Sequence, residues 1–145
     1  MVATPSGPNQ YTFKLVETTK QLHPQLPPTP IWAYDDGHLA GQAGSFGMAV
    51  AAQTGIPLTL NFTNELPAAY PSWIPLDPEL TFQHSSAVRI MTHLHGGFVA
   101  ADSDGNPAVT EGGFLKGATQ TVYLPEPGTR GRHKRRHAGV AAVVP

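Results

Sequence analysis

The segment around His93 and His95 holds the residues of this sequence best suited to chemistry. In a strand, side chains two residues apart lie on the same face, so the two imidazoles would point the same way. Neutral imidazoles held close together suit copper, zinc, iron or nickel. Two ligands alone make a weak site, and two unrelated histidines at a strand end are the alternative. The spacing therefore predicts part of a metal site whose remaining ligands come from elsewhere.

Three other histidines are further candidates for such a site, namely His84, His133 and His137. His84 precedes the pair in a segment that we expect to be a loop. His133 and His137 would share a face if their segment were helical. Glycines and neighbouring positive charges oppose both a helix and a bound cation there, so we expect neither to be a ligand.

The sequence contains no cysteine, which limits the kinds of metal site and catalytic site that the chain can form. It excludes disulfides, thiol nucleophiles, zinc–thiolate sites, iron–sulfur clusters and a blue copper site within this chain. No Ser-His-Asp set, phosphate-binding glycine loop or dinucleotide motif is present either. Any metal must be held by histidine, carboxylate or backbone groups.

The elements that must position the histidines are short strands. The chain has 145 residues, 40% hydrophobic, with 15 glycines and 15 prolines, which favours strands and turns over long helices. Alternating apolar residues predict strands over 11–15, 58–63, 88–94 and 121–124, and 30–34 and 46–51 also look extended. Residues 102–107 form a dense turn signal. The expected fold is an all-β antiparallel sandwich or Greek-key barrel.

A longer string around the histidines carries a family resemblance. Residues 91–107, Met-Thr-His-Leu-His-Gly-Gly-Phe-Val-Ala-Ala-Asp-Ser-Asp-Gly-Asn-Pro, resemble the first copper-ligand segment of the three-domain multicopper oxidases. The likeness is greatest to the bacterial laccase, bilirubin oxidase and phenoxazinone synthase group. Thr-Pro-Ile-Trp-Ala-Tyr at 29–34, Pro-Leu-Thr-Leu-Asn-Phe-Thr-Asn-Glu-Leu-Pro at 57–67 and Gly-Gly-Phe at 112–114 are similar as well. The resemblance covers roughly residues 10–125.

The resemblance implies the N-terminal, cupredoxin-like domain of such an oxidase. By position, His93 would match a ligand of the type 2 copper and His95 a ligand of the type 3 copper pair. Asp102 or Asp104 falls where some members place acids near the oxygen-entry region, although turn formation alone explains both residues. The expected fold is thus a cupredoxin-like Greek-key β-barrel or sandwich, incomplete at its C-terminal strands.

The sequence departs from the family pattern in two ways. The second His-x-His motif, expected after a Trp-Tyr dipeptide, is absent, and no cysteine can form the blue copper centre. We therefore expect copper binding with at most weak oxidation of phenolic small molecules by oxygen, through a site shared between chains of an oligomer. Whether the chain is an enzyme at all stays open.

The composition changes near residue 125 and predicts a domain over 1–125 and a tail over 126–145. Residues 1–129 hold ten acids and four bases, whereas 130–145 hold five bases and no acid. A truncation or a frameshift would explain the change. The lost strands would leave an exposed sheet edge that favours homo-oligomers, unless the apolar segment 138–144 replaces a strand.

The basic tail supports an alternative function. The chain could be a non-enzymatic β-scaffold whose tail contacts an anionic partner, or a truncation product without function. We do not expect nucleic-acid binding, because no aromatic residue interleaves the tail's charges. No apolar run reaches membrane-spanning length, and no signal peptide is present as written. We therefore expect a cytoplasmic location by default.

Overall fold

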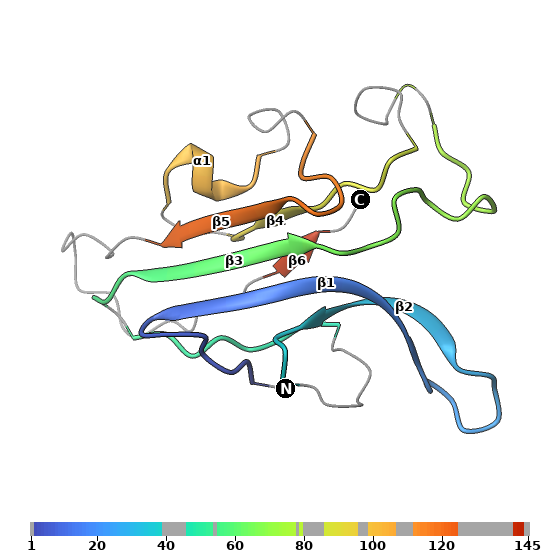
Figure 1. The fold of residues 1–145 in the computed structure, drawn as a ribbon, viewed down its shortest axis with the longest axis horizontal. Coiled ribbons are helices and arrows are strands. Elements are labelled where there is room, and N and C mark those ends of the chain that lie inside the picture. Colours follow the sequence, from blue (N-terminus) through green and yellow to red (C-terminus); the bar gives the residue numbers. More distant parts are fainter. Residues whose placement is uncertain are drawn as a thin grey trace.

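The structure is a computed structural model that describes residues 2–38, 46–53, 55–77, 79, 86–95, 99–106, 112–124 and 141–143. Strands β1 (Gln10–Lys20), β2 (Thr29–Asp35), β3 (Leu58–Asn64) and β5 (Thr119–Leu124) form an open sheet in the order β2-β1-β3-β5 (Figure 1). Strands β4 (Met91–His93) and β6 (Ala141–Val143) form a second, two-stranded sheet. This architecture confirms the all-β prediction.

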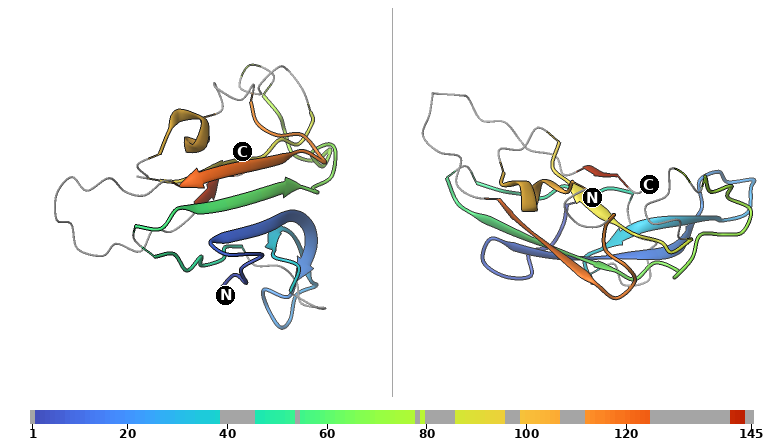
Figure 2. Two further views of the ribbon diagram at one scale, coloured as in Figure 1. Left: turned by 60° about the vertical axis from the view of Figure 1, so that its left-hand side comes forward. Right: turned by 90° about the horizontal axis from the view of Figure 1, so that it is seen from above.

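The two sheets form two layers. Seen from above, β4 and β6 lie on one side of the four-stranded sheet (Figure 2, right). Strand β1 pairs antiparallel with β2 and parallel with β3, and β3 pairs antiparallel with β5. In the described residues, no helix has both the length and the apolar character that crossing a membrane requires.

Apolar side chains fill the space between the layers. Alternating positions of β1 and β3 point inward, and Phe13 stacks on Phe62 with ring centroids 5.2 Å apart. The cluster also takes residues from the second layer: the core consists of Ala3, Tyr11, Phe13, Leu15, Leu58, Leu60, Phe62, Leu66, Val88, Ile90 and Val122. The period-two pattern of the sequence therefore predicted the inner face of the sheet correctly.

The segment that carries the histidine pair is less regular than its sequence pattern predicted. Residues 88–94 were expected to form one strand, but only Met91–His93 do so. Ile90 instead forms an isolated bridge with Phe114, and the amide of each donates to the carbonyl of the other. Burial does not alternate either, because both Met91 and Thr92 are buried. A strand that is covered on both of its faces buries successive side chains, which removes the alternation.

The end of the chain pairs with this same strand. Residues 141–143 form β6, which is antiparallel to β4 and places Ala141 opposite His93. The sequence left open whether the apolar end would replace a strand or leave an edge exposed. The structure shows these three residues as a strand that pairs with β4. The proposed boundary at residue 125 stays a prediction.

The hydroxyl of Tyr34 gives a prediction about stability. It is buried without a hydrogen-bond partner among the described residues, and burial raises the pKa of Tyr34 to about 12. Tyr34→Phe removes this unpaired group, so we expect it to stabilise the fold by about 1 kcal/mol at neutral pH. Because the pKa is raised, the folded state holds the proton of Tyr34 more tightly than the unfolded state does, and the stability seen at neutral pH persists up to pH 10. That stability is lost as the pH rises toward 12.

Urea denaturation of both proteins between pH 7 and pH 11 measures this effect. The wild-type protein should lose more stability above pH 10 than Tyr34→Phe does. Tyr123→Phe, at a tyrosine that is 50% exposed, serves as the control and should behave like the wild type. A Tyr34→Phe variant that is less stable than the wild type at neutral pH would show that the hydroxyl is paired in the folded protein.

Candidate metal site

The structure brings His93 and His95 together at the end of β4. Their ring centroids are 5.9 Å apart, and the rings are nearly perpendicular at 80°. The His93 side chain is 33% exposed, so a small solute can reach it. Strand β4 ends at His93, and His95 lies in the turn beyond it. The proximity that strand geometry predicted is thus present, although only His93 belongs to a strand.

A backbone carbonyl orients the His93 ring. Nδ1 of His93 lies 2.5 Å from the carbonyl oxygen of Asp104, and 3.5 Å from the carboxylate oxygen Oδ1 of the same residue. A carbonyl oxygen can only accept a hydrogen bond, so Nδ1 carries the proton and donates it. The lone pair of the neutral ring is then on Nε2, which is the arrangement that metal-ligating histidines show. The ring is thereby prepared to bind a cation through Nε2.

The carbonyl of Asp104 is placed by a tight turn after one turn of helix. Helix α1 (Ala101–Asp104) ends at Gly105, whose φ of 78° is in the left-handed region. A Cβ on Gly105 would lie 1.9 Å from the carbonyl oxygen of Thr92 and 3.0 Å from the Cα of His93. Only glycine therefore lets this turn approach β4 so closely. The sequence signal over 102–107 predicted the turn but not its contact with the strand.

Two residues that position this strand were missed by sequence reasoning. Gly105 was given no role beyond the predicted turn at 102–107. Gln120 lay just before the predicted strand 121–124, yet it belongs to β5, is 2% exposed, and its amide forms hydrogen bonds with the backbone of Thr92. A polar residue at an inward-facing position was the signal that could have identified Gln120.

The histidine pair fits copper as part of a coordination sphere. Imidazole nitrogen is a good ligand for copper, and the free Nε2 of His93 is such a donor. The described residues contain no group of three or more His, Asp or Glu side chains that could hold a metal. His84, His133 and His137, the further candidate ligands, lie outside the described residues. The basic segment on which the alternative function depends lies outside them as well.

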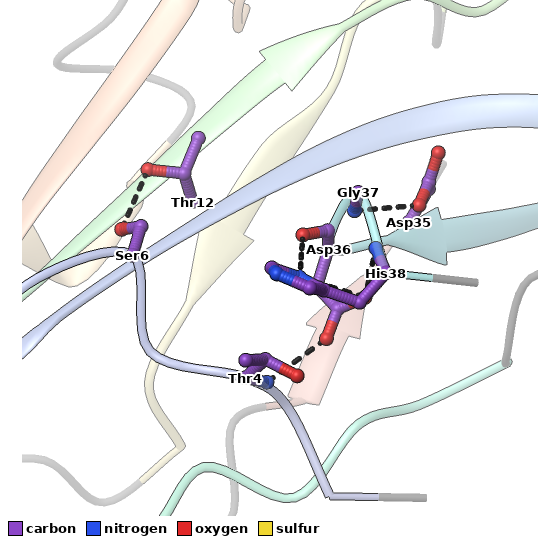
Figure 3. A network of polar contacts seen from close by, with 7 residues as sticks. All are labelled: Thr4, Ser6, Thr12, Asp35, Asp36, Gly37 and His38. Atoms are coloured by element: carbon purple, nitrogen blue, oxygen red, sulfur yellow. Dashed lines mark hydrogen bonds and ion pairs between the residues drawn. The ribbon is translucent and has the colours of Figure 1, made fainter. Parts of the chain in front are cut away.

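Asp35 and Asp36, next to His38, accept hydrogen bonds from backbone amides. Asp36 accepts hydrogen bonds from the amides of Thr4, at 2.9 Å, and His38, at 3.1 Å (Figure 3). Burial by itself raises the pKa of Asp36, but these hydrogen bonds outweigh it and leave the pKa lowered. The carboxylate thus stays ionised and fixes the N-terminal segment beside β2. The role of Asp36 in this cluster is therefore structural.

The sequence is similar to copper oxidases. No family model matches the chain. A laccase of Bacillus subtilis (strain 168) is 33% identical over 118 residues, which are 77% of this chain and 20% of the relative. "Multicopper oxidase LPR1 homolog 5" of Oryza sativa subsp. japonica is 32% identical over 68% of this chain and 15% of the relative. A Haloferax volcanii laccase is 28% identical over 94% of this chain and 25% of the relative.

The fold agrees with these similarities. A multicopper oxidase from Campylobacter jejuni, described as a metallo-oxidase, matches 88% of this chain with a TM-score of 0.57 at 17% sequence identity. The match covers 21% of that protein. This chain therefore spans a quarter or less of the length of the relatives described above.

Proposed function

From the premise that this chain is homologous to part of the laccases and multicopper oxidases and has their cupredoxin-like fold, we propose that it binds copper through His93 and His95. One observation carries the proposal. The Asp104 carbonyl holds the proton of His93 on Nδ1, which leaves the lone pair on Nε2, and the centroid of the His95 ring lies 5.9 Å from that of His93. Each imidazole would contribute one nitrogen ligand to copper.

The activity that follows is a weak oxidation of phenolic substrates. Bound copper would supply one-electron redox chemistry. Overall, four phenols would each lose one electron and one proton, and one oxygen molecule would take these up to give two waters. The chain's own part is to hold the two imidazoles in place and to orient the His93 ring through the Asp104 carbonyl. Because two ligands do not complete a site, we propose that other copies of the chain supply the remaining ligands in a homo-oligomer.

Copper retention tests the proposal. The protein is loaded with Cu(II), dialysed exhaustively, and its copper content is measured per chain. We expect the wild-type protein to retain copper and His93→Ala/His95→Ala to lose at least about 90% of it, because the double variant lacks both of the proposed imidazole ligands in every chain. His23→Ala, at an exposed histidine distant in sequence, is the matched control and should retain copper like the wild type.

Two outcomes would contradict the proposal. Equal copper in the wild type and the double variant would place the metal elsewhere, and no retained copper in the wild type would mean that the histidine pair is idle. If copper is retained, oxidation of a phenolic dye under air tests the activity. Oxidation that persists in His93→Ala/His95→Ala would rule out this pair as its source.

A further inference from the structure

The side chain of Gln120 connects β5 to the strand that carries His93. Gln120 points from β5 into the space between the layers, beside its cross-strand partner Phe62. The amide of Thr92 donates to Oε1 of Gln120 at 2.9 Å, and Nε2 of Gln120 donates to the carbonyl of Thr92 at 3.2 Å. Nε2 also lies 3.7 Å from the sulfur of Met91. One buried side chain thus satisfies both backbone groups of Thr92.

Gln120 takes the place that a neighbouring strand would have. In a strand, the backbone groups of successive residues point to opposite edges. Strand β4 pairs with β6 along one edge, while the backbone groups of Thr92 point to the other edge, toward β5. Strands β4 and β5 belong to different sheets, so no ladder joins them. The amide of Gln120 supplies the same donor and acceptor that a ladder would supply at this position.

We propose that Gln120 is a positioning residue for the histidine pair. This inference rests on the proposed copper binding. Thr92 directly precedes His93. The two hydrogen bonds of Gln120 therefore fix the backbone from which the His93 side chain extends. Gly105 also packs against the Thr92 carbonyl, and this contact places the turn that holds the Asp104 carbonyl. A shift of Thr92 would therefore move His93 away from the carbonyl that orients its ring.

Gln120→Met tests the proposal, because methionine has a similar length but neither amide group. We expect its affinity for Cu(II), measured by competition with a chelator, to fall about 10-fold to 100-fold, as when a partner that orients a metal ligand is removed. Val122→Ala is the matched control. Val122 is the next inward residue of β5, is 3% exposed, and its substitution weakens the core without touching Thr92. Its copper affinity should stay within about twofold of the wild type.

Hydrogen exchange gives a readout that does not require copper. The amide of Thr92 should exchange faster in Gln120→Met than in Val122→Ala when the two are compared at equal global stability. The Nδ1 proton signal of His93 should likewise change only in Gln120→Met. Gln120→Glu, which keeps the acceptor for the Thr92 amide, is a second variant in case Gln120→Met does not fold, and its affinity should be intermediate.

The outcomes separate the two proposals. If the wild type binds no copper but Thr92 and His93 respond to Gln120→Met alone, then Gln120 positions the strand and the proposed function fails. If the wild type binds copper and Gln120→Met binds it as tightly as Val122→Ala does, the positioning role is overturned. The role is overturned as well if the Thr92 amide exchanges equally in both variants.

Discussion

Gly105→Ala is expected to destabilise the protein by about 4 kcal/mol or more and to abolish copper retention. The added Cβ would lie 1.9 Å from the Thr92 carbonyl oxygen, far inside any allowed contact. Either the turn or β4 must move. Because the turn also supplies the Asp104 carbonyl that holds Nδ1 of His93, such a movement separates the ring from its partner.

A matched glycine separates this steric effect from backbone strain. Gly37 has the same φ of 78° as Gly105, but a Cβ there meets no atom of the described residues within 4 Å. Gly37→Ala should therefore cost only the left-handed backbone penalty, about 1 kcal/mol, and should retain copper. Urea denaturation gives both free energies of unfolding. If Gly105→Ala lowers the free energy of unfolding no more than Gly37→Ala does, the turn does not pack against β4 as described.

Asn64→Leu is expected to cost about 3 to 5 kcal/mol in the free energy of unfolding. Asn64 is 0% exposed and links the two layers. Its Nδ2 donates to the carbonyls of Phe114, at 2.8 Å, and Val88, at 3.3 Å, and its Oδ1 accepts from the amide of Leu66 at 3.0 Å. Leucine has a similar shape but takes these hydrogen bonds away from the Leu66 amide and the Val88 carbonyl in the core, and it leaves the Phe114 carbonyl with the Ile90 amide. Burying backbone groups without these partners costs more than losing the hydrogen bonds themselves.

Asn61→Leu on the same strand is the control for this variant. Asn61 accepts one hydrogen bond, from the hydroxyl of Thr121 at 2.9 Å, and both lie on the outer face of the sheet. Losing this exposed hydrogen bond in Asn61→Leu should change the free energy of unfolding by no more than about 0.5 kcal/mol. Thermal and urea unfolding of both variants measure the difference. Similar losses at the two asparagines would contradict the role of Asn64 between the layers.

Local patterns predicted much of the sheet. Alternation over 11–15, 58–63 and 121–124 indicated β1, β3 and β5, because a half-buried strand repeats every two residues whatever its partners are. The spacing of His93 and His95 predicted their proximity for the same local reason. The strings shared with the oxidases indicated the family, which sequence and fold comparisons both support.

Contacts between distant segments could not be predicted in this way. Asn64 bonds to backbone groups 24 and 50 residues away, and Gln120 to one 28 residues away. Both lie one position outside the alternating segments 58–63 and 121–124, and neither was assigned a role from the sequence. Their partners are backbone groups, which are the same at every position, so no residue type in the sequence reveals the pairing.

The sequence by itself determined the β character of the chain, the inward faces of its long strands, and the histidine pair. These properties depend on the order of neighbouring side chains. Only the tertiary structure decided that Asp104 orients His93, that Gly105 and Gln120 both contact the backbone of Thr92, and that residues 141–143 pair with β4. Such contacts depend on how two layers pack, and close packing is a property of the whole molecule.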